Sequence, residues 1–498
     1  MGPQLNADIK ERICQAAHIQ DAQKTPELAY VHPYPRHFST ACMALTHVDR
    51  SWRHVGLRYA WRTVYIDDAL SNAAITAMRL THGACTRKLW IQVKFHSIAS
   101  HYRRYAQTHE NSDIQPFCDL ARWPHLADLE IVYAYKCAFP GLASYLEPRL
   151  GRVRRLTIKG RVPIDMRRGA LMLRSPDIEE IHFCAMPRCD DSLSSISSHS
   201  DPVLSLPIAA SVSAITMTTL VDIRIVRSVL ARTRCQLRRL ELIGLSSEQL
   251  TTARVFCHYT TSTQQSARVW TQLLALSIKL STASDDGSPV CVSLDSEEFP
   301  KLTSLAIADC PCSVAEEPEH PACISYGKSF SKQWPCLAHV RLQALSNGNA
   351  WAIARSVSRL TTLHVSSDLL ISPQCMMSAA GLWNLLTAAL PLQSVSIRCA
   401  FAQAAFVDKH SDVRLDFGQV SKTSALYVVD TPHIVLTTHQ AQDIRRACQN
   451  LVKLEVGNKK CGSSSISEHR GAEQRLCTPL LTSSHRRLAS LVNFWRVE

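Results

Sequence analysis

The chain has 498 residues, of which 46% are hydrophobic and 19% are charged, and its formal net charge is +13. These values describe a soluble globular protein, and the absence of any run of about 18 apolar residues predicts no transmembrane helix. Asp8, Lys10 and Glu11 interrupt the first residues, so we expect no secretory signal and an intracellular protein, cytoplasmic or nuclear. The 19 cysteines are then expected to be reduced thiols that pack as small hydrophobic side chains.

Two stretches near the start of the chain have the apolar spacing of amphipathic helices. In both, apolar residues recur every three or four positions, which places each set on one helical face. Helices this short cannot bury their apolar faces alone, so a partner or the adjoining chain must cover them. We therefore predict a small all-α region at residues 1–62. Its two apolar sets are Leu5, Ile9 and Ile13, followed by Leu45, Val48 and Trp52.

A short pattern, apolar-x-x-apolar-x-apolar, then recurs along the rest of the chain. Its last two apolar residues alternate with other residues, which is typical of a strand buried on one face. The copies are Trp61-Val64-Ile66, a partial Leu89-Ile91, Leu126-Leu129-Ile131, Val153-Leu156-Ile158, Ile178-Ile181-Phe183, Leu220-Ile223-Ile225, Leu237-Leu240-Leu242, Leu273-Leu276-Ile278, Leu302-Leu305-Ile307, Leu337-Val340-Leu342, Leu360-Leu363-Val365, Leu392-Val395-Ile397 and Leu451-Leu454-Val456.

The segments between these copies include three with helical spacing, at 349–360, 378–391 and 438–451, the last opened by a capping box of Thr437 and Gln440. Strand and helix alternating at intervals of about 23 to 37 residues predict an α/β, leucine-rich-repeat-like solenoid over 63–498, a curved and mainly parallel sheet with outer helices. An ordinary α/β domain with several similar strands is the alternative. Polar composition predicts loop insertions near 190–216, 281–298, 311–328 and 457–475.

The residues that flank the apolar pair of each strand face the opposite side of the sheet, which is the concave side of a solenoid. They carry charges of both signs or are small and polar. A row of this kind can give an extended protein ligand specificity and orientation, although a solvated face without a ligand has the same composition. The candidate substrate-binding residues are Arg155, Lys159, His182, Arg224, Arg239, Glu241, Arg341 and His364.

We find no motif for a catalytic nucleophile, a phosphate-binding loop or a zinc protease. Cys310, Cys312, His320 and Cys323 come closest to a metal site, but their spacing matches no standard zinc finger. We therefore expect no catalytic residue, no metal and no cofactor. Between positions 50 and 104 the sequence contains ten Lys or Arg residues, and its only acidic residues there are Asp67 and Asp68. Without a recognition motif, this basic stretch favours a solvated face or an acidic protein partner over direct binding of nucleic acid, and we expect no membrane partner.

The segment "ALTHVDRSWRHVGLRYAWRTVYID", residues 44–67, resembles an F-box, with Arg50, Trp52 and Arg53 as the closest matches. The chain as a whole resembles fungal proteins in which an F-box precedes degenerate leucine-rich repeats. The resemblance implies a non-catalytic substrate-recognition subunit of a Skp–Cullin–F-box ubiquitin ligase, whose repeats hold a protein substrate. It also implies that a Skp-type adaptor, which connects to the cullin core, binds the two apolar sets defined above. The alternative is a leucine-rich-repeat scaffold with no attachment to a ubiquitin ligase.

Overall fold

The computed structural model describes most of the repeating core and the N-terminal helices. The described residues are 6–31, 39–67, 78, 80–93, 123–133, 153–159, 177–184, 208–218, 229–230, 232–245, 269–280, 294–308, 330, 332–343, 345–371, 377–388, 390–401, 425–458 and 466–469.

The central element is one sheet in which neighbouring strands follow chain order from β1 to β15. Strands β1 to β14 are parallel, and β15 pairs antiparallel with β14. The strands are β1 (Thr63–Asp67), β2 (Lys88–Val93), β3 (Asp128–Tyr133), β4 (Arg155–Lys159), β5 (Glu180–Cys184), β6 (Ala214–Thr218), β7 (Arg239–Leu245), β8 (Ala275–Leu280), β9 (Ser304–Ala308), β10 (His339–Leu342), β11 (Thr362–Ile371), β12 (Ser394–Phe401), β13 (Val428–Leu436), β14 (Lys453–Asn458) and β15 (Ile466–His469).

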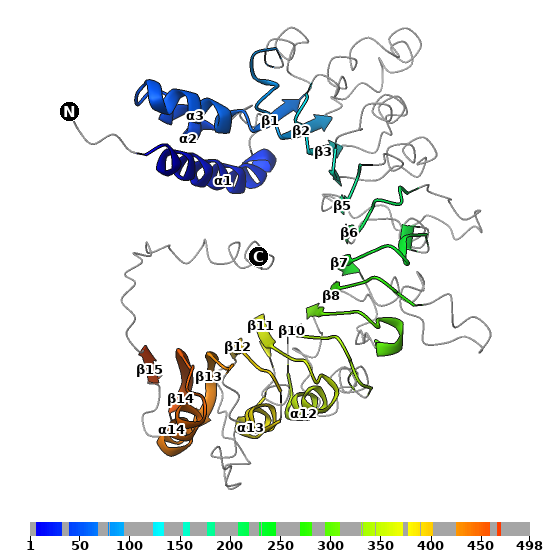
Figure 1. The fold of residues 1–498 in the computed structure, drawn as a ribbon, viewed down its shortest axis with the longest axis vertical. Helices are drawn as coiled ribbons and strands as arrows, with labels where there is room; N and C mark the ends of the chain where they lie inside the picture. Colours follow the sequence, from blue (N-terminus) through cyan, green and yellow to red (C-terminus); the bar gives the residue numbers. More distant parts are fainter. Residues whose placement is uncertain are drawn as a thin grey trace.

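The sheet curves into an arc, and the helices lie at one end and along the outer side (Figure 1). Helices α1 (Ala7–Val31), α2 (Thr40–Leu45) and α3 (Arg50–Ala60) precede β1. A short 3₁₀ helix, η5 (Ser296–Glu298), precedes β9, and α12 (Asn347–Ser356), α13 (Ala379–Thr387) and α14 (Thr438–Ala447) form the outer layer near the other end. A continuous parallel sheet with outer helices is an α/β solenoid-like architecture, as the repeats predicted.

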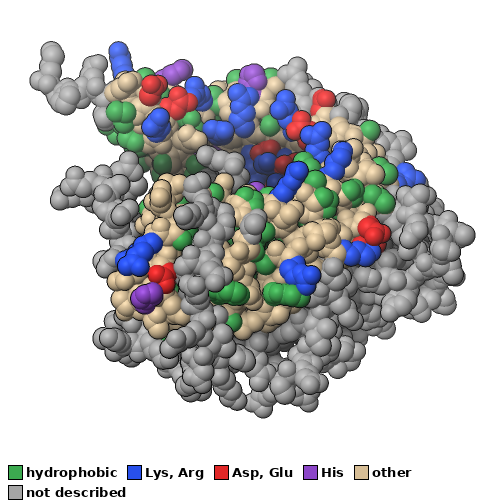
Figure 2. All heavy atoms as spheres, turned by 60° about the horizontal axis from the view of Figure 1, so that its bottom comes forward, with side chains coloured by type: hydrophobic (Ala, Val, Ile, Leu, Met, Phe, Trp, Pro, Cys, Tyr) green, Lys and Arg blue, Asp and Glu red, His purple; other side chains and the backbone are tan. Residues whose placement is uncertain are grey.

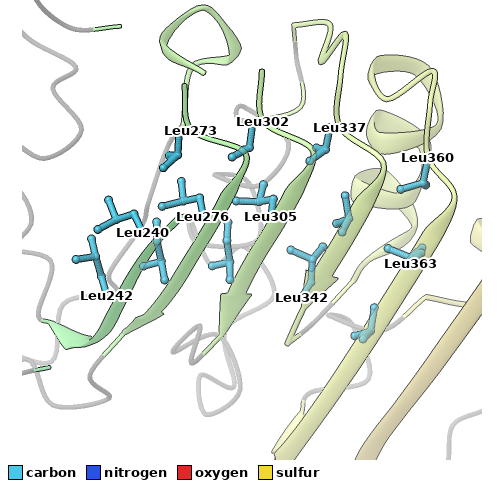
Figure 3. Packing of buried hydrophobic residues seen from close by; sticks show 14 of the residues in the cluster. Leu240, Leu242, Leu273, Leu276, Leu302, Leu305, Leu337, Leu342, Leu360 and Leu363 are labelled. Carbon is cyan, nitrogen blue, oxygen red and sulfur yellow. The ribbon is translucent and has the colours of Figure 1, made fainter. Parts of the chain in front are cut away.

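The core lies between the strands and this outer layer. In β10, His339 is exposed, Val340 and Leu342 are buried, and Arg341 is half-buried, so alternate residues face opposite sides. Each strand, together with the residues just before it and the segment that leads to the next strand, is called a coil here. The leucines of successive coils form rows across the strands, one through Leu273 and Leu302 and a second through Leu276 and Leu305 (Figure 3). Because each strand leaves one apolar face uncovered, every coil depends on its neighbours for burial.

A turn before several strands adds a further apolar row, which the three apolar positions of the repeat do not include. Its tetrapeptides share an aromatic residue at the first position and leucine at the fourth, as in Trp123-Pro124-His125-Leu126, Phe299-Pro300-Lys301-Leu302 and Trp334-Pro335-Cys336-Leu337. The Leu302 amide donates to the Phe299 carbonyl at 3.2 Å, which closes a turn whose second position suits proline. Phe299 stacks 6.4 Å from both Trp270 and Trp334, so these rings form a continuous aromatic stack across neighbouring coils.

The structure corrects several boundaries. Three strands were not predicted: β6, which follows Val212, β13, whose coil begins at Leu426, and β15. The copy placed at 220–225 lies outside the described residues. Of the insertion expected at 190–216, the described part from residue 208 belongs to a coil, because Val212 and Ile215 are buried. Leu294 is likewise buried within the expected insertion at 281–298, and β15 lies within that at 457–475. Ser-rich and Thr-rich surroundings hid these apolar positions.

The outer helices follow the predicted segments, with ends set by polar caps. Helix α14 has the predicted capping box, in which the Thr437 hydroxyl accepts from the Gln440 amide at 3.2 Å and the Gln440 side chain accepts from the Thr437 amide at 2.9 Å. The side chain of Asn347, at the start of α12, donates to the Ser378 hydroxyl at 2.9 Å. Ser378 is the N-cap of α13. This bond ties the first residue of α12 to the cap of α13.

Leu305→Ala should lower the free energy of unfolding by about 2–5 kcal/mol, because Leu305 is fully buried between neighbouring coils and truncation leaves a cavity. Ser304→Ala, on the opposite face of the same strand, should change it by less than about 0.5 kcal/mol. Urea unfolding followed by circular dichroism measures both. Equal losses in the two variants would contradict the assignment of the core face.

Candidate functional site

Helices α1 and α3 are joined by polar contacts along their length. Lys10 of α1 donates to the Ser51 hydroxyl and lies 5.7 Å from the centre of the Trp52 ring. One residue further, Glu11 accepts a hydrogen bond from the Tyr59 hydroxyl at 2.9 Å. The first contact places the beginning of α1 beside the beginning of α3, and the second ties Glu11 to the end of α3.

Helix α3 starts immediately after a turn that contains Val48. Asp49 caps it by accepting from the Ser51 and Trp52 amides at 2.6 and 3.0 Å. The Ser51 hydroxyl, which donates to the same carboxylate, and then these amides lower the pKa of Asp49. The sequence predicted that Leu45, Val48 and Trp52 share one helical face. In the structure Val48 instead lies in the turn between α2 and α3, so the three residues do not belong to one helix.

The residues predicted to bind an adaptor divide into an exposed and an interior group. Ile9, Ile13 and Val48 are exposed, to 45%, 39% and 61%. Leu45 packs, partly buried, against the core, and Trp52 is only 7% exposed. Trp52 is therefore part of the core of the helical region and is not an exposed contact. Leu5 lies outside the described residues.

The inner face of the sheet carries one residue of each strand in a continuous register. Following the pairing from β1 to β14, this middle row reads Tyr65, Trp90, Glu130, Thr157, His182, Thr216, Glu241, Ser277, Ala306, Arg341, His364, Ser396, Asp430 and Glu455.

The predicted substrate-binding residues are mostly on this face. His182, Glu241, Arg341 and His364 belong to the middle row. Arg155 and Arg239 begin β4 and β7, in the adjacent row, and Lys159 ends β4. Arg224 lies outside the residues that the structure describes.

An ion-pair cluster centred on Glu180 joins strands β3 to β7 on the inner face. Arg155 donates to Glu180 at 2.6 Å and lies 3.6 Å from Asp128, while Arg239 and His182 approach Glu180 at 3.7 and 3.5 Å. The hydrogen bond with His182, helped by Arg155 and the charge of Arg239, lowers the pKa of Glu180 from 4.5 to about 2. Thr216 donates to Glu241 at 3.2 Å and extends the cluster.

Two further clusters were not singled out from the sequence. Near the first end, Glu130 accepts from the Trp90 ring nitrogen at 2.8 Å and pairs with Lys88 at 2.6 Å. Near the other end, Asp430 pairs with Arg398 at 2.8 Å and with Lys453 at 2.9 Å. Asp430 was missed because its strand, β13, was missed; the pattern Leu426-x-x-Val429 was the available signal.

Between the clusters, the inner face changes in character. Strands β8 and β9 present mostly small residues there, including Ser277, Ala306 and Ser304, with Lys279 near the end of β8. Arg341 follows on β10, paired in register with His364, and donates to the Ser366 hydroxyl at 3.4 Å. The central stretch of the inner face therefore carries mostly short side chains, and the half-buried guanidinium of Arg341 lies at its border.

The environment of Arg341 differs from that of Arg398. Burial lowers the pKa of Arg341 to about 10, whereas the hydrogen bond to Asp430 raises the pKa of Arg398. Burial, followed by the charge of Arg341, also lowers the pKa of His364 to about 4, so its imidazole is neutral at pH 7. A desolvated cation beside a neutral imidazole can form strong charge-assisted hydrogen bonds with an anionic or polar ligand group.

Figure 2 shows a hollow in the surface with charged side chains inside it, and Lys and Arg side chains gathered mainly in the upper half of the view. Across the described ranges, no group of three or more His, Cys, Asp or Glu residues is placed to hold a metal ion. The cysteine cluster at 310–323 lies outside them. The arrangement is thus suited to binding an extended polar ligand.

The sequence matches no family model and no curated protein. None of the helices in the described part of the chain is long and apolar enough to cross a membrane.

The Glu180 cluster should make stability depend on pH. Because the folded pKa of Glu180 lies below 4.5, its contribution is complete above that pH and is lost as the pH falls toward 2. The stability difference between the wild type and Glu180→Gln should therefore shrink by about 1–2 kcal/mol between pH 6 and pH 3. Urea titrations at the two pH values measure it. Glu179→Gln, at a neighbouring exposed position, should show little pH dependence; a matching change there would contradict the assignment.

Proposed function

We propose that this chain is a non-catalytic substrate-recognition subunit of a Skp–Cullin–F-box type ubiquitin ligase. In this proposal, the N-terminal helices bind a Skp-type adaptor, and the inner face of a leucine-rich-repeat-like sheet binds a protein substrate. The observation that carries the proposal is the exposure of Ile9, Ile13 and Val48 on the helical region at the first end of the sheet.

A helical region that served only as a cap would turn its apolar residues toward the sheet or toward its own core. Here the core is made by other residues: Cys14 and Cys42 are fully buried, and the Cys42 thiol donates to the Cys14 carbonyl at 3.3 Å. Ile9 and Ile13 are one helical turn apart and therefore share a face of α1. The contact between Lys10 and Ser51 places the beginning of α1 at the same end of the region as Val48.

The resemblance to an F-box supports the choice of partner. Arg50 and Arg53 are exposed on α3 close to Val48, whereas Trp52 between them faces the interior. Trp52 would then support the binding surface from beneath, and the direct contacts would be Ile9, Ile13 and Val48. Leu45, partly buried, would lie at its border.

The inner face is the matching surface for a substrate. Its polar clusters and its central stretch beside Arg341 run across successive strands, and such a surface can orient an extended segment. A subunit of this kind accelerates ubiquitin transfer by holding the substrate near the charged conjugating enzyme, which is a proximity effect. It requires no nucleophile or cofactor of its own.

The double variant Ile9→Asp/Val48→Asp should weaken binding to the Skp-type adaptor of the same organism by at least about tenfold, because each change places a carboxylate in an apolar contact. Co-expression followed by isothermal titration calorimetry measures the loss. Val452→Asp is the matched control, since Val452 is 60% exposed at the far end of the sheet, and it should bind as the wild type does. A wild-type chain that does not bind the adaptor would favour the scaffold without a ligase.

Replacing Arg341 should impair the recognition of a substrate without affecting the adaptor. In cells that lack the chain, substrates are the proteins whose half-lives lengthen. The wild type and Arg355→Gln, a change on the outer helix α12, should restore their turnover, and Arg341→Gln should not. Restoration by all three would remove Arg341 from the proposed substrate site. Unchanged circular dichroism of Arg341→Gln would exclude misfolding.

A further inference from the structure

The residue immediately before each strand lies in a second continuous row, here called the rim. Each rim amide donates to the carbonyl of the preceding rim residue, from Arg87 to Arg62 at 2.8 Å through Val452 to Tyr427 at 2.9 Å. From β1 to β14 the rim reads Arg62, Arg87, Ala127, Arg154, Glu179, Ser213, Arg238, Leu274, Thr303, Ala338, Thr361, Gln393, Tyr427 and Val452.

The two halves of the rim differ in charge. The first seven positions include four arginines and one glutamate, whereas the last seven contain no charged residue. Both halves make the same backbone ladder, so the fold does not require a charge at these positions. The arginines therefore need an explanation other than the structure of the coil.

The rim arginines are available to a ligand. Arg62, Arg87, Arg154 and Arg238 are all exposed. Their local partners are weak: the Arg62 guanidinium lies 5.6 Å from the Tyr59 ring, Arg87 donates to the His125 carbonyl, and Arg154 is 4.0 Å from Glu179. Arg62 and Arg87 are also neighbours in the ladder, and like charges on adjacent strands are unfavourable unless a counter-charge lies nearby.

We propose that the first half of the rim, from Arg62 to Arg238, is a docking strip for an extended acidic protein segment. The span from β1 to β7 is about 29 Å at the spacing of parallel strands, which about nine residues of an extended peptide match. The strip uses neither the exposed apolar residues of α1 and the α2–α3 turn nor the inner-face clusters. The inference therefore does not depend on the proposed function.

A protein segment fits this strip better than a nucleic acid does. Glu179 on the rim would repel a uniform line of phosphates, whereas the acidic residues of a peptide can be spaced to avoid it. Single-stranded nucleic acids also need aromatic platforms for stacking. The Trp, Tyr and Phe residues of the first seven coils whose side chains are described are buried or half-buried, including Trp61, Trp90 and Trp123.

The test uses the full chain and a fluorescein-labelled peptide of alternating Glu and Ser, with a Gln-for-Glu peptide and a single-stranded oligothymidine as comparison probes. Fluorescence anisotropy should show saturable binding of the Glu peptide that weakens with salt. The variant Arg87→Gln/Arg154→Gln/Arg238→Gln should bind it about tenfold or more weakly. All three positions are exposed, so the variant should fold, which circular dichroism checks.

The control variant, Arg355→Gln/Arg359→Gln/Arg446→Gln, removes the same net charge from exposed positions on or next to α12 and α14 and should bind within about twofold of the wild type. The proposal is overturned if the control loses as much affinity as the rim variant, because net charge would then explain the binding. It is also overturned if the Glu peptide does not bind, or if only the oligonucleotide binds in a manner that depends on the rim.

Discussion

The structure depends on one constraint: no coil of this chain can cover its own apolar strand face. Leucines such as Leu276 and Leu305 are buried only because the neighbouring coil lies against them. The backbone ladder at the rim holds adjacent coils in the same register from β1 to β14. Burial and register together align equivalent positions of successive coils into rows, and the inner face and the rim are made of such rows.

The same constraint makes the two ends of the sheet special. At the first end, helices α1 to α3 precede β1, and buried Tyr59, Ala60 and Trp61 connect their core to that of the sheet. At the other end, β15 pairs antiparallel with β14 and occupies an edge that would otherwise present free backbone groups. The exposed apolar residues of the helical region are therefore not needed to close the solenoid, which is why the proposed adaptor site is placed there.

Because one side of each strand packs in the core, the residue types that differ between coils are concentrated on the other side and at the rim. Parallel pairing brings residues distant in sequence to neighbouring strands, so charges such as Asp128, Arg155 and Glu180 meet across them. The resulting pattern is segmented into an acidic and basic cluster at each end and small residues with a half-buried arginine toward the middle. The proposed binding roles follow from this segmentation, in which each stretch of the sheet offers a different chemistry.

The sequence by itself determined the strand repeat, the outer helices and the capping box of α14, because each depends on the spacing of a few nearby residues. It also placed Arg341 and His364 on one face, since alternation within a strand is local. Only the tertiary structure decided that Trp52 is interior while Val48 is exposed, that Asp430 joins Arg398 and Lys453, and that the rim arginines form a line. These features arise from contacts between coils separated by loops of varied length, and no local pattern encodes which residues those loops bring together.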